Sequence, residues 1–349
     1  MKPKVLYLAD SVLPPGGVQT LSTTCIQILC DLQGEGRLDC DCLVRRGAIP
    51  DGLPCRTAKD LGIVMQAKVA CAWLLQGTNL VFSDHLFTAR FASRVRAKHI
   101  FWAHLIEFDA PLQPIHQRSI ASSHQIICDS HFTSDYIAKL YPAIQPKLRV
   151  VHLGDSPRPS VPVPLYETNS PEQRLTMIGR MAPEERYKGH DQVIEALPSI
   201  LKQFPSCQIT MIGRGADRPR LQEKAKQLNL MNHVHFMGDV EDEKLFEVIK
   251  SSCGILLPSL REAFGIVYLY AMWAGIPAVA IRGTAGEEIL AECGVYAESQ
   301  TPDAINEAVC TILSGSWRFS HTSQLRYHKL FSYAAFKNRL AGLLAELLY

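Results

Sequence analysis

The chain has 349 residues, of which 47% are hydrophobic and 20% charged, a composition that excludes an intrinsically disordered chain because disorder requires low hydrophobicity and high net charge. The 36 basic and 34 acidic residues nearly balance, so no global attraction to nucleic acid is expected. No apolar run reaches the roughly 20 residues that a membrane span requires, and the length predicts about two domains.

The first half of the chain alternates short apolar runs with stretches long enough for helices. Lys4–Ala9 indicates a strand, the glycines that follow it indicate a loop, and 18–32 has the periodicity of a helix. Further strands are expected at 41–44, 80–82, 100–102 and 125–128, and further helices at 89–98 and 113–122. This alternation is typical of βαβ units with a parallel sheet.

A second series of the same kind follows a proline-rich stretch at 157–171, which we interpret as a linker. Strands are expected at 174–178, 208–212, 233–236, 254–257 and 278–281. We therefore predict an α/β protein with one domain over 1–165 and a second over 166–330.

Eleven cysteines are spread from Cys25 to Cys310 without any Cys-x-x-Cys pair. Disulfide scaffolds are short and secreted, and zinc sites show paired spacing, so we interpret most of these cysteines as small core residues in a reducing compartment. The first ten residues contain too short an apolar run for a signal peptide. These features predict a cytoplasmic protein.

Basic residues gather on one predicted helix of the first half. Arg90, Arg94 and Lys98 are spaced four residues apart, so on a helix over 89–98 they would share a face. Most such faces are simply solvated, and the other interpretation is contact with anionic lipid or an anionic acceptor at the inner face of a membrane.

Two cations follow the first strand of the second half. In MIGRMAPEERYKGHD, Gly179 provides a tight turn and is followed by Arg180 and, further on, by Lys188. Ligands of open α/β sheets bind beyond the carboxyl ends of the strands, where an arginine fork and a lysine charge suit a diphosphate. Taken alone, the pattern is equally typical of surface charge around a loop.

Two further motifs extend this pattern. Gly213 and Gly215 follow the next strand, and glycine permits close approach of backbone to a ligand. In PSLREAFGIVYLYAMWAGIP, Glu262 precedes a predicted helix at 266–274, whose first N–H groups suit phosphate or sugar oxygens. Glu262 has an alternative role as an ordinary helix-capping acid.

In this order and spacing, the motifs resemble those of the retaining glycosyltransferases of family 4. The resemblance covers nearly the whole chain, and it includes Gly16-Gly17-Val18, the Arg180/Lys188 pair, IGRG, His235-Phe236-Met237-Gly238, PSLREAFG, Ala274-Gly275-Ile276-Pro277 and Phe331-Ser332-Tyr333. It implies the GT-B fold, which is two Rossmann-like domains whose parallel sheets face a central cleft. It also implies that a last helix at about 331–349 packs back on the first domain.

The resemblance implies a nucleotide-diphosphate-sugar donor in the second domain and an acceptor against the first, without a metal or further cofactor. The acceptor would be a polysaccharide, a lipid-linked glycan or a small molecule. By analogy, Arg180 and Lys188 neutralise the diphosphate, Glu262 holds hydroxyls of the sugar, and His104 lies near the reacting sugar, with Glu107 a weaker candidate. His104 has an alternative reading as a structural histidine. The residues implied to contact the donor are Gly16, Gly17, Gly179, Arg180, Lys188, Gly213, Gly215, Phe264, Gly265, Ile266, Val267, Tyr270 and Glu287.

One position departs from the family signature of two glutamates separated by seven residues. The first is Glu262, but the second position holds Tyr270, and a phenol cannot match the bidentate acceptance of two ribose hydroxyls by a carboxylate. Three explanations stay open: Glu287 or Glu288 holds the ribose, the donor is unusual, or catalysis has been lost. The alternatives to a retaining hexosyltransferase are therefore an impaired sugar-nucleotide-binding partner protein or a GT-B sugar-nucleotide epimerase.

Two patterns suggest metal binding only superficially. Asp39-Cys40-Asp41 is formally the Asp-x-Asp metal clamp of another glycosyltransferase fold, but here it leads into an apolar strand. His233 and His235 have no partner at metal-ligand spacing. No metal site is predicted.

Overall fold

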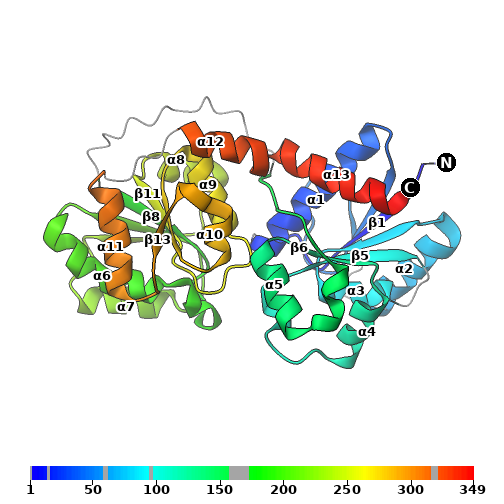
Figure 1. The fold of residues 1–349 in the computed structure, drawn as a ribbon, viewed down its shortest axis with the longest axis horizontal. Coiled ribbons are helices and arrows are strands. Elements are labelled where there is room, and N and C mark those ends of the chain that lie inside the picture. Colours follow the sequence, from blue (N-terminus) through cyan, green and yellow to red (C-terminus); the bar gives the residue numbers. More distant parts are fainter. Residues whose placement is uncertain (1, 14–15, 58–61, 94–96, 157–172, 316–320) are drawn as a thin grey trace. The chain divides into compact units, whose positions relative to one another are not determined.

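The computed structural model describes residues 2–13, 16–57, 62–93, 97–156, 173–315 and 321–349. The chain divides into two compact units, which we call unit 1 (Met1–Arg158 with Leu330–Tyr349) and unit 2 (Pro159–Lys329) (Figure 1). The domain boundary predicted at residue 165 lies outside the described residues, as does the whole proline-rich stretch at 157–171.

Unit 1 is built on a seven-stranded sheet in which every neighbouring pair is parallel, in the order β3-β2-β1-β4-β5-β6-β7. The strands are β1 Lys4–Ala9, β2 Asp39–Val44, β3 Arg56–Thr57, β4 Leu80–Ser83, β5 Lys98–Ala103, β6 Gln125–Cys128 and β7 Leu148–Val150. A parallel sheet covered on both faces favours uninterrupted apolar strands, and all four residues of β4 are buried.

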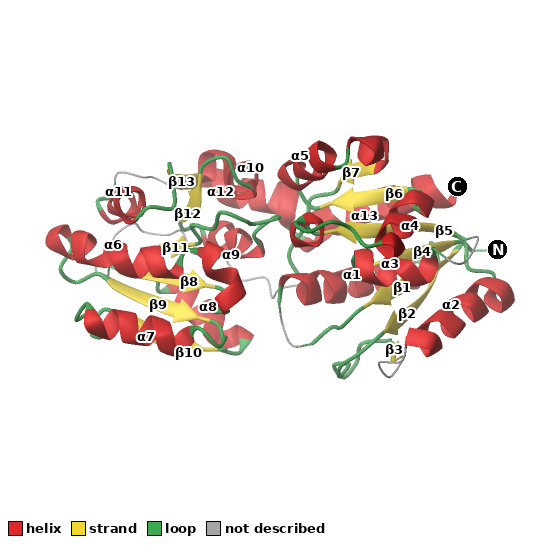
Figure 2. Cartoon of the chain, turned by 90° about the horizontal axis from the view of Figure 1, so that it is seen from below, coloured by secondary structure: helices red, strands yellow, loops and turns green. Residues whose placement is uncertain are grey.

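Helices cover both faces of this sheet (Figure 2). They are α1 Gly17–Gly34, α2 Gly62–Gln76, α3 Leu86–Ala92, α4 Pro114–Ser122, α5 His131–Leu140 and α13 Tyr333–Leu348, with 3-10 turns at Leu105–Phe108 and Pro142–Lys147. The last of them, α13, comes from the far end of the chain and buries Phe336, Leu340 and Leu344 in unit 1. Lys337 of α13 binds Asp31 of α1, with Nζ 3.1 Å from the carboxylate.

Unit 2 has a six-stranded parallel sheet in the order β10-β9-β8-β11-β12-β13. Its strands are β8 Arg174–Ile178, β9 Gln208–Ile212, β10 Val234–Gly238, β11 Gly254–Leu256, β12 Ala278–Ile281 and β13 Gly294–Ala297. Its helices are α6 His190–Gln203, α7 Arg218–Gln227, α8 Asp242–Lys250, α9 Ile266–Ala274, α10 Ala285–Leu290, α11 Pro302–Leu313 and α12 His321–Arg326, with 3-10 turns at Pro183–Lys188 and Ala291–Cys293 and a π-turn at Tyr327–Phe331 that runs into unit 1. The core lies between the sheet and these helices, where residues such as Met177, Leu256 and Ile305 are fully buried.

The fold class predicted from the sequence, an α/β protein with two parallel-sheet units, is confirmed. The ten predicted strands all correspond to strands of the structure, with small differences at their ends. Three short strands, β3, β7 and β13, were not predicted.

The predicted helix at 89–98 is wrong, and so is the basic face derived from it. Helix α3 ends at Ala92, and Lys98 begins β5, where its Nζ donates a hydrogen bond to the Leu347 carbonyl at 2.9 Å. Arg90 packs over the ring of Phe87, with 3.8 Å between the guanidinium carbon and the ring centroid. Arg94 lies outside the described residues. Among the described residues, no helix combines the length and apolar character that crossing a bilayer would demand.

Candidate functional site

In unit 2 the candidate site lies where the strand order reverses. Strands β8 and β11 are neighbours, but the chain continues from β8 toward one edge of the sheet and from β11 toward the other. Ligands of open α/β sheets bind beyond the carboxyl ends of strands at such a switch point. Arg180 follows β8, and Glu262 follows β11. The predicted residues thus lie on the two loops that this topology favours.

The loop after β8 is held in place by the glycine loop after β9. The Met181 amide donates to the Arg214 carbonyl at 2.8 Å, which extends the pairing of β8 and β9 beyond the strands. Gly215 has a φ of 152°, and a Cβ there would overlap the carbonyl of Met181. A Cβ at Gly213 would likewise overlap the carbonyl of Gly179. These two glycines therefore allow two backbone loops to approach, and that contact positions Arg180.

The two predicted cations are paired with carboxylates. Arg180 donates a hydrogen bond to Glu185, and the Nζ of Lys188 lies 3.9 Å from an oxygen of Glu185 and 3.9 Å from an oxygen of Glu262. Glu185 is only 7% exposed, whereas the Arg180 side chain is 59% exposed. The four side chains carry two positive and two negative charges. Sequence reasoning did not predict Glu185, which lies in a charged stretch where every residue looks solvated.

A second unpredicted residue, Gln300, joins the two loops. Its side-chain amide donates to the carbonyl of Tyr187 at 2.6 Å and to that of Pro258 at 2.7 Å. The Leu260 amide also donates to the Tyr187 carbonyl, at 3.0 Å. Gly189, with a φ of 88°, leaves room for the Pro258 carbonyl, which a Cβ would approach to 2.8 Å. These contacts hold the loop that carries Lys188 against the loop that carries Glu262.

Helix α9 begins at Ile266, four residues after Glu262. Its N-cap, Gly265, has a φ of 83°, and a Cβ there would overlap the ring of Tyr268. Tyr268 is fully buried, and its hydroxyl donates to the Leu257 carbonyl at 2.9 Å, which fixes the helix start against β11. The amides of Ile266 and Val267 lie in the first turn, where helix N–H groups have no intrahelical acceptor. The predicted donor-contacting segment is therefore a helix N-terminus beside Glu262.

The residues considered for ribose binding lie on two elements, Tyr270 on α9 and both Glu287 and Glu288 on α10. Tyr270 is half-buried on α9, one turn after its start. Glu287 lies in the first turn of α10, where one carboxylate oxygen accepts from Arg282 at 2.8 Å and the other from the Gly283 amide at 2.7 Å. Its carboxylate is therefore already used to close the turn before α10. A ribose role for Glu287 stays a prediction.

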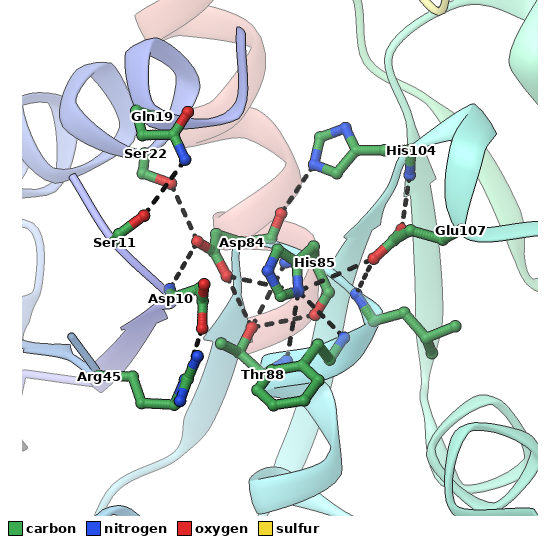
Figure 3. Close-up of polar contacts among 12 residues, drawn as sticks. Asp10, Ser11, Gln19, Ser22, Arg45, Asp84, His85, Thr88, His104 and Glu107 are labelled. Atoms are coloured by element: carbon green, nitrogen blue, oxygen red, sulfur yellow. Dashed lines mark hydrogen bonds and ion pairs between the residues drawn. The ribbon is translucent and has the colours of Figure 1, made fainter. Parts of the chain in front are cut away.

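Unit 1 contains a polar cluster centred on Asp84, a residue that the sequence did not single out (Figure 3). Asp84 follows β4 and is fully buried. One of its carboxylate oxygens accepts from the Asp10 amide at 2.8 Å and from the Ser22 hydroxyl at 3.2 Å, and the other accepts from the Thr88 hydroxyl at 2.7 Å. Strands β1 and β4 are neighbours at the strand-order reversal of this sheet. The cluster thus lies at the equivalent position of unit 1.

His104 follows β5 and belongs to this cluster. Its Nε2 lies 3.0 Å from the Asp84 carbonyl, and its Nδ1 lies 3.9 Å from the Asp129 carboxylate. Burial alone would lower its pKa, but Asp129, Glu107 and the Asp84 carbonyl outweigh that effect and raise the pKa of His104 to about 9. The imidazole is therefore protonated at neutral pH.

Glu107, the weaker candidate, has a structural role. Its carboxylate accepts from the His104 amide at 2.8 Å and from the Leu86 amide at 2.7 Å, so it joins the turn after β5 to the start of α3 (Figure 3). His85 caps the same helix, because its Nδ1 accepts from the Phe87 amide at 3.0 Å. These bonds fix the backbone around His104.

Of the two glycines at the start of α1, Gly17 borders open space, whereas a Cβ built on Gly16 would lie 2.7 Å from the side-chain oxygen of Gln19. Gly16 is the N-cap of this helix, and Gly17 is its first residue. No atom of the described part of the chain lies within 4 Å of a Cβ built on Gly17. In the Asp-x-Asp sequence of β2, Asp41 is bound by the Arg56 guanidinium.

Comparison with known proteins gives a family match within the second unit and the fold of the chain. Residues 166–328 match the model of the family described as glycosyl transferases group 1. An uncharacterised glycosyltransferase of Methanocaldococcus jannaschii is 28% identical over 218 residues, which are 58% of this chain and 53% of the relative. The phosphatidyl-myo-inositol mannosyltransferase of Mycolicibacterium smegmatis is 34% identical over 131 residues, 37% of this chain and 33% of the relative. The chain thus spans about half or less of the length of these curated relatives.

Two solved structures show the fold over the whole chain. Anabaena Alr3699/HepE, solved in complex with UDP, superimposes with a TM-score of 0.76 at 15% identity and covers 98% of this chain and 100% of its own. Sucrose-phosphate synthase from Thermosynechococcus elongatus has a TM-score of 0.79 at 17% identity, with 99% of both chains covered. These neighbours have the GT-B fold, and the resemblance inferred from the sequence motifs is confirmed.

Proposed function

We propose that this chain, whose residues 166–328 match the glycosyl transferases group 1 family and which has the GT-B fold, transfers a sugar from a nucleoside-diphosphate sugar to an acceptor. We further propose that the anomeric configuration is retained and that no metal is required. The donor would bind to unit 2, and the acceptor would bind mainly to unit 1.

The observation that carries the proposal is the position of Lys188 between Glu185 and Glu262, at 3.9 Å from each, at the switch point of β8 and β11. A lysine and an arginine supply the positive charge that a departing diphosphate needs, and such charge stabilises a leaving group in the transition state. A carboxylate beside a helix N-terminus accepts hydrogen bonds from sugar hydroxyls while the N–H groups bind oxygens. A complex of the neighbour from Anabaena with UDP supports this donor class.

In unit 1, His104 supplies a further positive charge. Because its pKa is raised to about 9, it is an imidazolium at neutral pH and donates hydrogen bonds rather than accepting a proton. We propose that it binds an oxygen of the transferred sugar. The proton of the acceptor hydroxyl would then go to an oxygen of the departing diphosphate.

A panel of UDP-, GDP-, ADP- and dTDP-sugars tests this proposal. Ligand binding to the folded state alone raises stability by about 2.7 kcal/mol at a hundredfold excess over Kd, so a thermal-shift screen identifies the donor. NMR of the product then gives the anomeric configuration. Glu262→Gln and Lys188→Ala are each expected to lower turnover at least ~10-fold, which corresponds to about 1.4 kcal/mol.

Glu247→Gln makes the same change as Glu262→Gln at an exposed glutamate of unit 2 and is the matched control. Near-native turnover in both site variants would contradict the site assignment.

Tyr270 favours one second candidate, a sugar-nucleotide-binding protein without transferase activity. Binding of a donor without transfer or hydrolysis across the panel would support it. Tyr270→Glu separates the two cases further, because tighter donor binding in this variant would show that the tyrosine lacks a ribose contact. An epimerase would convert the donor without any acceptor, which the same NMR assay detects.

A further inference from the structure

Four of the eleven cysteines converge on one face of unit 1, although they belong to three different segments. Cys30 lies near the end of α1, Cys40 and Cys42 lie on β2, and Cys55 directly precedes β3. All eleven cysteines are free thiols. The proposed transferase chemistry uses none of them.

The backbone brings Cys42 and Cys55 side by side. Strand β2 pairs with β3 in parallel, with Leu43 opposite Arg56, so the preceding residues, Cys42 and Cys55, are also opposite each other. Neighbouring strands lie about 4.8 Å apart, and paired residues point to the same face of a sheet. The two thiols are close enough to shift each other's pKa. This Cα spacing lies in the range of about 4.4–6.8 Å that a disulfide requires.

Cys40 points to the same face as Cys42, because side chains alternate along a strand. Cys30 of α1 is its neighbour, and the two thiols are close enough to shift each other's pKa. Gln33, one helical turn after Cys30, fixes this contact: its side-chain oxygen accepts from the Cys40 amide and from the Cys40 thiol, both at 2.9 Å. A third thiol contact, between Cys40 and Cys42, makes the cluster continuous.

The contacts make the four sulfurs chemically unequal. Hydrogen bonds from the thiols of Cys30 and Cys42 hold the pKa of Cys40 below its usual range, and the thiol of Cys42 lowers that of Cys55. The pKa values of Cys30 and Cys42 are raised by the same contacts. Within each pair, one sulfur therefore loses its proton more readily than the other. Reactive cysteines are those with thiolate character and some solvent access, and Cys40 is half-buried.

We propose that the cluster is a site of reversible thiol oxidation, in which Cys40 forms a disulfide with Cys30 and, in a second step, Cys55 forms one with Cys42. The oxidant is a peroxide. The Cys40 thiolate attacks the peroxide O–O bond, giving a sulfenic acid and hydroxide, or an alkoxide from an organic peroxide. The Cys30 sulfur then displaces the hydroxyl as water, the S–S bond forms, and two electrons have passed from the two sulfurs to the peroxide.

Tryptic peptides of the full chain separate the partners. Cleavage gives 5–37 with Cys25 and Cys30, 38–45 with Cys40 and Cys42, and 47–56 with Cys55. After hydrogen peroxide titration and blocking of free thiols, mass spectrometry without reduction should show 5–37 linked to 38–45 at a peroxide dose that leaves the exposed Cys71 largely unmodified. A higher dose should link 38–45 to 47–56. Dithiothreitol should reverse both links.

Cys30→Ser should lower the yield of the 5–37/38–45 link at least ~10-fold. This result would also exclude the buried Cys25, which lies on the same peptide, as the partner. Cys71→Ser, the matched control at an exposed cysteine, should leave it unchanged. Oxidation of Cys71 before any link appears in the natural protein would overturn the proposal, as would a persistent 5–37/38–45 link in Cys30→Ser. Because the first of these outcomes needs no variant, a folding defect in Cys30→Ser does not affect it, and neither depends on transferase activity.

Discussion

Arg180 and Lys188 share their negative partner, Glu185, which is almost completely buried and follows Arg180 by five residues in the same loop. An anion that approaches the two cations would meet a carboxylate already bound there. Burial weakens the screening of that charge, so its effect on an anionic ligand is larger than that of a surface carboxylate. With a diphosphate bound as proposed, Glu185 would oppose its binding and favour release of a diphosphate product.

Glu185→Gln is therefore expected to strengthen the binding of inorganic pyrophosphate by about tenfold, because the amide keeps a hydrogen-bond acceptor for Arg180 while the negative charge is lost. Calorimetric titration measures this affinity without requiring knowledge of the donor base. Glu184→Gln is the matched control, since it removes the same charge from an exposed neighbour and should change the affinity little. Weaker or unchanged binding in Glu185→Gln would show that the carboxylate has no such opposing effect.

His104 makes a second prediction at the scale of one residue. Its pKa is about 9 in the folded chain, compared with about 6.5 for an unperturbed histidine, so the protonated form stabilises the fold. This contribution is fully present below about pH 6.5 and is lost as the pH rises through about 9. The difference in unfolding free energy between the natural protein and His104→Gln should shrink by about 3 kcal/mol between pH 6 and pH 10, in denaturant titrations.

His99, on the same sheet, is expected to change the pH dependence of stability in the opposite direction. Burial lowers its pKa to about 4, so its contribution is present above about pH 6.5 and is lost as the pH falls toward 4. The difference in unfolding free energy between the natural protein and His99→Gln should therefore change with pH in the acid range and stay constant between pH 7 and pH 10. A His104 difference that is constant with pH would contradict the raised pKa.

At the scale of elements, the glycine loop after β9 determines the position of the cation loop after β8. A side chain at Gly215 would force the 179–182 backbone away from its contact with 213–215. Gly215→Ala is expected to weaken donor binding at least ~10-fold and to destabilise unit 2 by about 1–3 kcal/mol, as forced backbone strain does. Binding of the donor identified in the panel and thermal unfolding measure the two effects.

Gly283→Ala is the matched control for this loop. Gly283 also has a positive φ, of 75°, but no atom of the described residues lies within 4 Å of a Cβ built on it. Its substitution should cost only the strain of the left-handed conformation, about 1 kcal/mol, and should leave donor binding unchanged. Equal losses of binding in the two variants would contradict a specific role of the loop contact.

The sequence predicts most elements because buried parallel strands such as β1 and β4 are continuous apolar runs between breakers. It misses β3, which has two residues, and β7, whose central residue is Arg149. It also overextends the helix at 89–98, because the sequence has no glycine or proline between Ala92 and Lys98. Such boundaries depend on tertiary pairing, here on the position of Lys98 beside Leu80 in the sheet.

The residues of the candidate site also divide into those that the sequence predicts and those that it misses. Lys188 and Glu262 are predicted from their places after strands, and the structure brings them to 3.9 Å from each other. Glu185, Gln300 and Asp84 are missed, because each acts through contacts with residues that are distant in sequence or through a burial that its charged neighbours conceal. Their roles can be recognised only from the folded structure, in which the loops at the strand ends contact one another.

At the level of the whole molecule, the hydrophobic core of unit 1 depends on α13, which comes from the other end of the chain. Phe336 is fully buried, and its ring lies 6.3 Å from that of Trp102 on β5. Phe336→Ala is expected to lower the free energy of unfolding of unit 1 by about 3–5 kcal/mol. Hydrogen exchange should accelerate in β5 and not in β8 of unit 2. Asn338→Ala, at an exposed position of the same helix, should change neither. Equal acceleration in both units would show that they unfold together.

Unit 1 is assembled from two stretches of chain, one on each side of unit 2 in the sequence. During synthesis, β1 to β7 leave the ribosome long before α13, and the surface that receives Phe336 and Leu340 stays uncovered until the residues of unit 2 have been added. Domains generally fold as units while the chain grows. Unit 2, which is one continuous stretch, is thus able to fold first, and the half that begins the chain is the last to be completed.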